Sequence, residues 1–157
     1  MCAKLTEETN RAVKKTAPPP AEQEVFLQVQ RTADRLMRDL EELLKPSKLS
    51  TTQYNVLRIL RGAGPTGMAC HEIACGMITR DPDMTRLLDR LEQRGLLSRQ
   101  REKEDRRVIR TRISSQGLKL LRSLDEPVQA LHRRQLAHLG DKRLRQLGTL
   151  LESARQE

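Results

Sequence analysis

The chain has 157 residues, which is enough for one ordinary domain and too few for two full ones. Thirty Lys and Arg residues against 21 Asp and Glu residues give a formal charge of +9, which favours a polyanionic partner, while 36% hydrophobic residues exclude a wholly disordered chain. One Phe, one Tyr and no Trp exclude a single-strand binder that stacks successive bases on aromatic rings.

The short apolar runs and the odd number of cysteines indicate the cellular compartment of the protein. No run of apolar residues is long enough to span a bilayer, and the N-terminus lacks the hydrophobic region of a secretory signal, so we expect no membrane partner. The three cysteines are an odd number and do not suit a disulfide framework. The expected compartment is a reducing cytoplasm.

The N-terminal part of the sequence predicts a flexible segment followed by one long helix. Residues 1–21 are polar and run into Pro18-Pro19-Pro20, which cannot continue a helix. From Val25 to Leu44 apolar residues recur at three- and four-residue steps, and Lys45-Pro46 stops the pattern. This pattern predicts an amphipathic helix of roughly twenty residues.

Three further helices are predicted before the periodicity changes. Leu49-Ser50-Thr51 supplies a cap for a helix at about residues 53–61, and a short helix at about residues 67–77 follows. After a break, Asp81-Pro82 is expected to open another helix, because Asp is a good N-cap and Pro suits the first helical position. Gly95 is expected to close that helix in the left-handed conformation.

A basic hairpin is predicted next. Residues 108–113 alternate with the two-residue period of a half-buried strand, and residues 96–101 can pair with them across a charged tip at residues 102–107. Residues 96–113 hold seven basic and three acidic side chains, a net charge of +4 in under an eighth of the chain.

The C-terminal part predicts two more helices, one capped by Ser114 and one starting near Asp141. The first helix and the last two helices carry apolar stripes. Together these stripes are larger than the surface that the helices and hairpin between them, about 65 residues, could cover. Either these helices pack only on their own chain, or they join two copies in a homodimer. The second interpretation is preferred because an uncovered stripe would be a large exposed apolar patch.

The order of these elements predicts a mainly α fold. A short helix, a break and a second amphipathic helix form a helix-turn-helix, and the basic hairpin directly afterwards makes it a winged helix with a two-stranded β-wing. The winged helix-turn-helix lobe is expected at residues 49–113, within one domain at residues 22–157. The flanking helices at residues 22–45 and 115–157 are the expected dimerisation helices.

The chain resembles the MarR family (multiple antibiotic resistance regulators), which are dimeric winged-helix transcription factors. The matching stretches are Leu49 to Gln53 with Val56-Leu57, DPDMTRLLDRLEQRGLL from Asp81 to Leu97, and EDRRVIRTRIS from Glu104 to Ser114 followed by Gly117. The resemblance implies that the wing-tip Arg107 reaches the minor groove and that Asp105 helps to hold the wing. It also implies that Thr85 and Arg86 contact DNA from the recognition helix.

The chemistry of these residues fits duplex DNA. Arg86 can donate two parallel hydrogen bonds to guanine, and Thr85 can bond a base edge or pack its methyl group on thymine. Asp89 is expected to orient a neighbouring arginine. The candidate contacts on the recognition helix are Arg80, Asp81, Asp83, Thr85, Arg86 and Arg90, and those on the wing are Arg99, Arg101, Lys103, Asp105, Arg106 and Arg107. The alternatives to DNA contact are that the helix face is simply solvated and that the wing-tip charges form surface ion pairs.

The cysteines of the short helix suggest a metal or redox site only weakly. Cys70 and Cys75 lie about 140° apart around a helix axis, which argues against a shared zinc ion. Cys70 falls on the apolar stripe, where a buried thiol is inert packing. Cys75 is the better redox candidate. No cofactor, metal or catalytic residue is expected, and an enzyme has almost no support.

The expected function is therefore a sequence-specific regulator of transcription that binds double-stranded DNA as a homodimer. The resemblance implies a repressor released by an effector, and effectors in the family are often small phenolic or anionic molecules. The alternative is a sequence-tolerant architectural or RNA-binding protein that uses the same basic surface.

Overall fold

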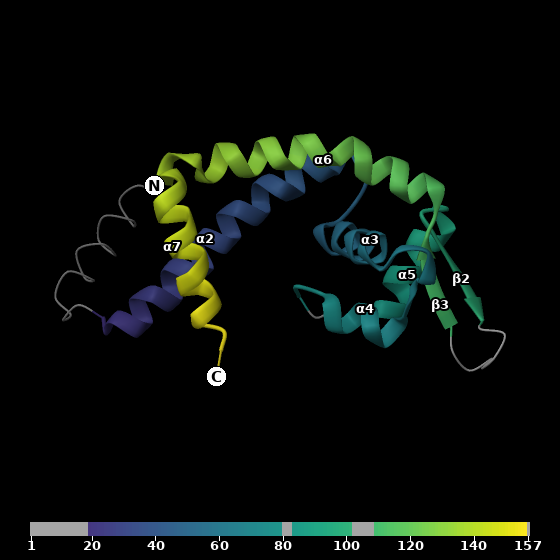
Figure 1. Ribbon diagram of the computed structural model, residues 1–157, viewed down its shortest axis with the longest axis horizontal. Helices are drawn as coiled ribbons and strands as arrows, with labels where there is room; N and C mark the ends of the chain where they lie inside the picture. The colour runs from purple at the N-terminus through teal and green to yellow at the C-terminus, as the bar shows by residue number, and fades with distance from the viewer. Residues whose placement is uncertain (1–18, 80–82, 102–108, 157) are drawn as a thin grey trace, which may run out of the picture. The chain divides into compact units, whose positions relative to one another are not determined.

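The computed structural model describes residues 19–79, 83–101 and 109–156 (Figure 1). Most of the expected flexible segment lies outside these residues, as do Arg80, Asp81 and the tip of the wing. The chain divides into two compact units, Met1–Leu36 and Met37–Glu157. The second unit contains the end of the first long helix and every later element.

The described residues are mostly helical, with a small antiparallel sheet, as the sequence predicted. In chain order the elements are α2 (Ala21–Leu44), η1 (Lys45–Ser47), α3 (Thr51–Ala63), η2 (Gly64–Thr66), β1 (Met68–Ala69), α4 (Cys70–Gly76), α5 (Met84–Gln93), β2 (Leu97–Arg101), β3 (Ile109–Ile113), α6 (Ser115–Leu136), η3 (Ala137–Leu139) and α7 (Gly140–Ser153).

Most helix ends lie where the sequence signals placed them. Ser50 caps α3 in a capping box, in which its hydroxyl accepts from the Gln53 N–H at 3.1 Å and the Gln53 side chain accepts from the Ser50 N–H. Ser114 caps α6, with its hydroxyl accepting from the Gly117 N–H at 3.0 Å. Gly95 follows α5 with φ of 68°, which confirms the predicted left-handed residue.

The start of α5 differs from the prediction. The N-cap is Asp83, whose carboxylate accepts from the Arg86 N–H at 3.2 Å, and the helix begins at Met84. The sequence predicts the cap at Asp81 because Pro82 suits a first helical position. Asp83 meets the same requirement for a side-chain acceptor two residues later, directly before the buried Met84.

The sheet has the two predicted wing strands and one more strand. Strand order is β1-β3-β2, all antiparallel, with Leu97 opposite Ile113 and Arg101 opposite Ile109 across the wing. The additional strand β1 pairs Met68 with Thr111. Two residues are too few to show an alternating pattern, so the sequence predicts a helix from about residue 67 in place of this strand.

The hydrophobic core lies in the second unit and joins the winged helix to α6. Leucines of α3, α5 and α6 meet there with Ile73 of α4 and with the residues before and in β2. Figure 1 shows α3, α4, α5 and the two wing strands gathered near the N-terminal half of α6. The most deeply buried large side chains are Leu44, Leu57, Leu60, Ile73, Leu88, Leu91 and Leu121.

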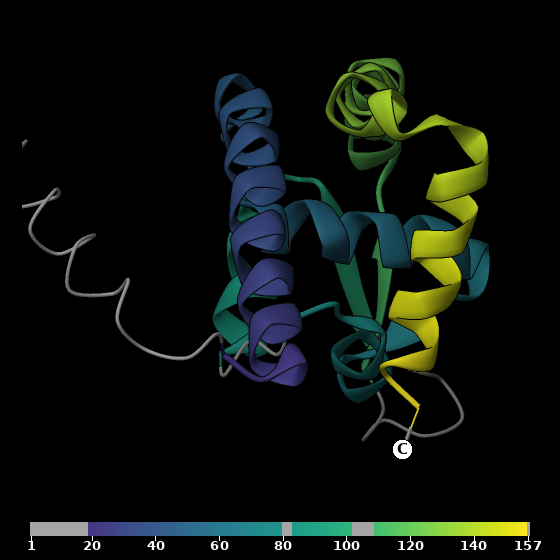
Figure 2. The ribbon, with the colours of Figure 1, turned by 90° about the vertical axis from the view of Figure 1, so that its left-hand side faces the viewer.

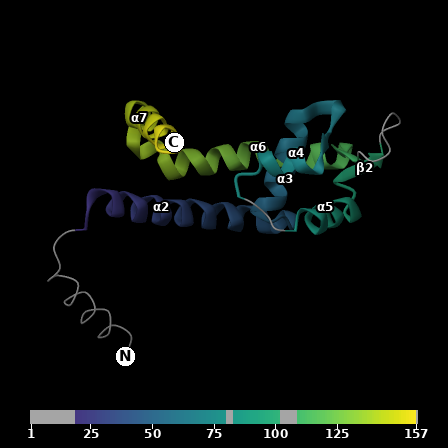
Figure 3. The same ribbon diagram turned by 90° about the horizontal axis from the view of Figure 1, so that it is seen from below.

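Helix α7 contributes nothing to this core. It has no buried residue, and the side chains of Leu147, Leu150 and Leu151 are 39%, 60% and 40% exposed. Figures 2 and 3 show α7 turning away from the C-terminal end of α6, opposite the end that carries the sheet. In the first unit, Val25 and Phe26 of α2 are also exposed. No helix among the described residues is long and apolar enough to cross a membrane.

Gly117 provides a test of the packing between α6 and the start of the wing. A Cβ atom at this position would lie 2.2 Å from the Leu96 carbonyl oxygen and 2.8 Å from Cγ1 of Ile113. We expect Gly117→Ala to lower the free energy of unfolding by about 1–3 kcal/mol, because the wing must shift away from α6. Urea unfolding measures the change.

The matched control is Gly62→Ala in α3, where a Cβ atom would meet nothing within 4 Å. Since Ala is the better helix former, this variant is expected to be neutral or more stable by up to about 1 kcal/mol. Equal unfolding free energies for the two variants would contradict the close approach at Gly117.

Candidate nucleic-acid interface

Helix α5 has one buried face and one polar face that is open to solvent. Leu87, Leu88 and Leu91 are buried in the core. Thr85, Arg86 and Arg90 are exposed, as is Gln93. The burial of the leucines fixes the rotation of the helix about its axis, so the three residues predicted to contact DNA are displayed together.

Asp83 acts on this face through Arg86. Its carboxylate caps α5 and also lies 3.2 Å from Nε of Arg86, whose side chain is 77% exposed. Asp83 is among the DNA contacts that the sequence predicts, and the structure adds this capping role. A direct contact between Asp83 and DNA stays a prediction.

Arg99 in strand β2 is joined to two carboxylates of α5. Its guanidinium donates to Asp89 Oδ1 at 2.5 Å and to Glu92 Oε2 at 2.6 and 2.8 Å, while its backbone N–H donates to Glu92 Oε1 at 2.9 Å. The hydrogen bonds that Arg99 donates to Glu92, and then the one to Asp89, raise the pKa of Arg99. The sequence predicts a phosphate contact for Arg99, whereas the structure places its charge against Asp89 and Glu92 of α5.

Of the two carboxylates that bind Arg99, the sequence predicts a role for one and gives no prediction for the other. Asp89 was expected to orient an arginine, and its bond to Arg99 confirms this expectation. Glu92 was not singled out. Its spacing of three residues from Asp89 puts both on neighbouring turns of one helix face, which is the signal that could have identified it.

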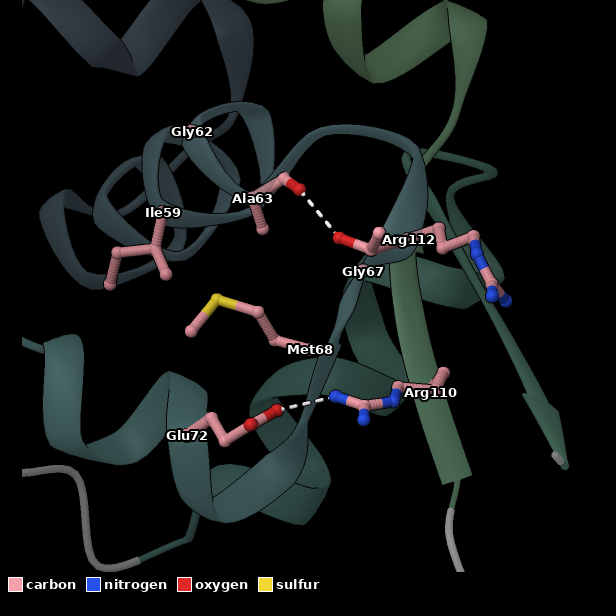
Figure 4. Close-up of a pocket in the computed structure, with 9 residues that line it drawn as sticks. Ile59, Gly62, Ala63, Gly67, Met68, Glu72, Arg110 and Arg112 are labelled. Atoms are coloured by element: carbon pink, nitrogen blue, oxygen red, sulfur yellow. Dashed lines mark hydrogen bonds and ion pairs between the residues drawn. The ribbon is translucent and has the colours of Figure 1, made fainter. Parts of the chain in front are cut away.

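Strand β3 is tied to the other helix of the helix-turn-helix. Nη1 of Arg110 donates to Oε2 of Glu72 in α4 at 2.7 Å, and the same oxygen accepts from the Ala69 N–H at 2.6 Å (Figure 4). The Ala69 N–H, followed by the charge of Arg110, lowers the pKa of Glu72. Each wing strand therefore holds a different helix of the motif.

An open groove of about 780 Å³ lies beside this ion pair, where the wing is attached to the helices. The side chain of Met68 points into it from β1 (Figure 4). Each of its polar side chains already has a partner within the protein: besides the Glu72–Arg110 pair, Thr66 donates to the Ala63 carbonyl at 2.9 Å and Arg112 to the Pro65 carbonyl at 2.8 Å. These bonds join α3 to η2, η2 to β3, and β3 to α4.

Several predicted contacts cannot be placed on this surface. Of the wing candidates, Arg99 and the exposed Arg101 lie in β2, two residues apart. The predicted contacts outside the described residues are Arg80, Asp81, Lys103, Asp105, Arg106 and Arg107. Their roles stay predictions.

The cysteines of α4 differ in part from expectation. Both Cys70 and Cys75 are free and exposed, so the prediction that Cys70 is buried packing is wrong. Because β1 occupies residues 68–69, α4 begins only at Cys70, and Ile73 takes the buried position. A redox role for Cys75 stays a prediction. Among the residues that the structure describes, no group of three or more His, Cys, Asp or Glu side chains could hold a metal ion.

Comparison with known proteins identifies this arrangement. A sequence model of the MarR family matches residues 49–109. The crystal structure of a MarR transcription factor from Planctomyces limnophilus is 45% identical, with a TM-score of 0.67 over 87% of this chain and 98% of that one. The chain belongs to the MarR family. It is a DNA-binding transcriptional regulator with the winged-helix fold of that family.

Two further proteins are similar over most of the chain. The transcriptional repressor IacR of Pseudomonas putida is 28% identical over 127 residues, which are 81% of this chain and 75% of that protein. A mutant MarR of E. coli, in complex with operator DNA, shares the fold with a TM-score of 0.77 at 22% identity, over 88% of this chain and 100% of that one. The resemblance inferred from the recognition helix and the wing is confirmed.

Proposed function

We propose that this MarR-family regulator is a homodimeric repressor that reads a pseudo-palindromic operator and is released by a small anionic effector. The observation that carries the proposal is the exposed polar face of α5. Thr85, Arg86 and Arg90 project from a helix whose opposite face is buried, so a rigid set of hydrogen-bond donors is available to the major groove.

Two relatives support the finer parts of the proposal. IacR is named a repressor, and the E. coli MarR structure contains operator DNA. A repressor of this kind would act by occupying promoter DNA. Within the family fold, α5 is the element that corresponds to a recognition helix and the hairpin of β2 and β3 corresponds to a wing.

The exposed leucines of α7 support a second copy as the partner. Leu147, Leu150 and Leu151 form an apolar face that the described chain leaves in solvent, and such faces on a helix mark contact surfaces. A two-fold dimer would present two α5 helices to half-sites about one helical turn apart, which matches a pseudo-palindrome.

A small cavity in the second unit supports the effector. It has a volume of about 210 Å³ and lies between α2, α3, the segment after α4, and α6. Its lining combines apolar side chains with two basic ones that suit an anion: Met37, Leu40, Met77, Arg58 and His132 are among the residues that surround it. The size favours a molecule with a single ring.

Selection of binding sites from a random duplex library tests the DNA-binding proposal. We expect the wild-type protein to select a two-fold symmetric site. In Arg86→Ala the preference at one base position of each half-site should weaken by about 1–3 kcal/mol, because the bidentate contact is lost. Gln93→Ala, on the same face but one turn or more away, is the control. A wild-type protein that prefers no sequence would favour the architectural or RNA-binding alternative.

Sedimentation equilibrium tests the dimer. We expect a dimer at micromolar concentration, and we expect Leu150→Glu to raise its dissociation constant at least about tenfold, because a charge would be buried in the interface. Thr149→Glu adds the same charge to the same helix on the side away from these leucines and should leave the constant unchanged. A folded wild-type monomer at these concentrations would contradict the proposal.

Titration with benzoate and 2-hydroxybenzoate tests the cavity. We expect either probe to raise the melting temperature and to release DNA, and Arg58→Gln to weaken release by about tenfold, because it removes the cation that pairs with the carboxylate. Arg61→Gln in the same helix is the charge-matched control, since Arg61 bonds Asp125 of α6 instead. Release that is equal in the two variants would exclude an anion site at Arg58.

A further inference from the structure

Strand β2 contains two arginines, Arg99 and Arg101, and Arg99 is paired with carboxylates of the protein itself. The Arg99 side chain is only 26% exposed and makes three side-chain hydrogen bonds to Asp89 and Glu92. Arg101, two residues along the strand, is exposed. One guanidinium beside two carboxylates leaves this cluster with a net charge of −1. Arg99 therefore offers no free positive charge to a phosphate.

We propose that Arg99 is a positioning residue for DNA recognition, which locks the wing to the recognition helix and withdraws the Asp89 carboxylate from the DNA. The inference rests on the proposed function, because it assigns a role within the DNA-binding surface. It also replaces the phosphate contact that the sequence predicted for Arg99 with an action through α5.

The geometry of the contact holds strand β2 against helix α5. Asp89 and Glu92 are three residues apart, so they lie on successive turns of α5 and Arg99 spans both. Glu92 additionally accepts from the backbone N–H of Arg99 at 2.9 Å. Since β2 is the last strand in the sheet order, this bond fixes the strand along an edge that β3 does not cover. Helix and strand are thus joined through both backbone and side chain.

The position of Asp89 explains why neutralisation matters. Asp89 follows Thr85 by four residues and Arg86 by three, so it lies on the helix face predicted to enter the major groove. A free carboxylate there would repel the phosphates that flank the groove. The Arg99 guanidinium, 2.5 Å from Asp89 Oδ1, holds this carboxylate toward the wing.

This arrangement makes predictions opposite in sign to those of a phosphate contact. On charge alone, Glu92→Gln should tighten DNA binding, because it removes a negative charge near a polyanion. If the lock matters more, the same variant should weaken binding, because Arg99 loses its charged partner. Arg99→Lys separates the two roles in another way, since Lys keeps the charge but cannot form the same set of bonds to two carboxylates.

The experiment measures Kd for a duplex that the wild-type protein has selected from a random library, and for the same duplex trimmed of the outer base pairs that the wings would reach. Both are measured at the same series of salt concentrations, so that Kd values are compared at equal salt and the salt dependence of each variant is obtained. The variants are Arg99→Lys, Arg99→Ala and Glu92→Gln. Arg101→Lys and Arg101→Ala are the matched controls, and urea unfolding is followed for every variant.

We expect Arg99→Lys and Glu92→Gln each to weaken binding to the full duplex by about tenfold, as for the loss of a charged hydrogen-bond partner. On the trimmed duplex the loss should be under about twofold, because the wing no longer contributes. As the comparison for a phosphate contact, Arg101→Lys keeps the charge and should retain the salt dependence of the wild type, whereas Arg101→Ala should show a smaller one.

Three results would overturn the inference. Wild-type affinity in Arg99→Lys together with weaker binding in Arg99→Ala would make Arg99 a phosphate contact. Equal losses on both duplexes, with a lower free energy of unfolding, would show a general structural role. A wild-type protein that selects no duplex would overturn the proposed function and the inference with it, whereas unchanged affinity in all three variants overturns the inference alone.

Discussion

The burial of one face of α5 is the constraint on which the DNA-binding surface depends. Leu88 and Leu91 are 1% and 0% exposed in the core that α3, α4 and α6 share. A helix anchored in this way cannot rotate about its axis without exposing leucine side chains, which costs about 1.5–3 kcal/mol for each one. The core packing of these leucines thus holds the backbone of α5 with its polar face outward.

The wing takes its position from this anchored helix. Strand β2 is fixed through Arg99 to α5, and strand β3 is fixed through Arg110 to Glu72 of α4. Gly117 lets α6 approach the Leu96 carbonyl closely, just before β2 begins. Helix-turn-helix, wing and α6 therefore form one connected lobe in which much of the positive charge of the wing strands is already used for internal bonds. Positive charge available to phosphates must come from the remaining basic residues, such as Arg101.

Much of this lobe could be predicted from the sequence, because its signals are local. Ser50, Ser114 and Gly95 mark helix ends through their own backbone geometry, and the leucines of α5 reveal the buried face by their spacing. What the sequence did not reveal depends on contacts between distant segments. The role of Arg99 requires knowing that β2 packs beside α5, and the two-residue strand β1 exists only because β3 is there to pair with it. Cys70, which was predicted to be buried, is exposed as the first residue of α4, directly after that strand.

The small cavity in the second unit, proposed as the effector site, is lined by residues that lie close in sequence to α5. Ile78 and Thr79 line the cavity and stand only a few residues before Met84, where α5 begins. Ile78 is 83% exposed, so apolar surface is available at this point for a ligand to cover. A ligand can shift an equilibrium only by its difference in affinity for two states. A molecule that contacts residues 77–79 in one arrangement of α5 and not in another would supply that difference directly, without a long path of coupled residues.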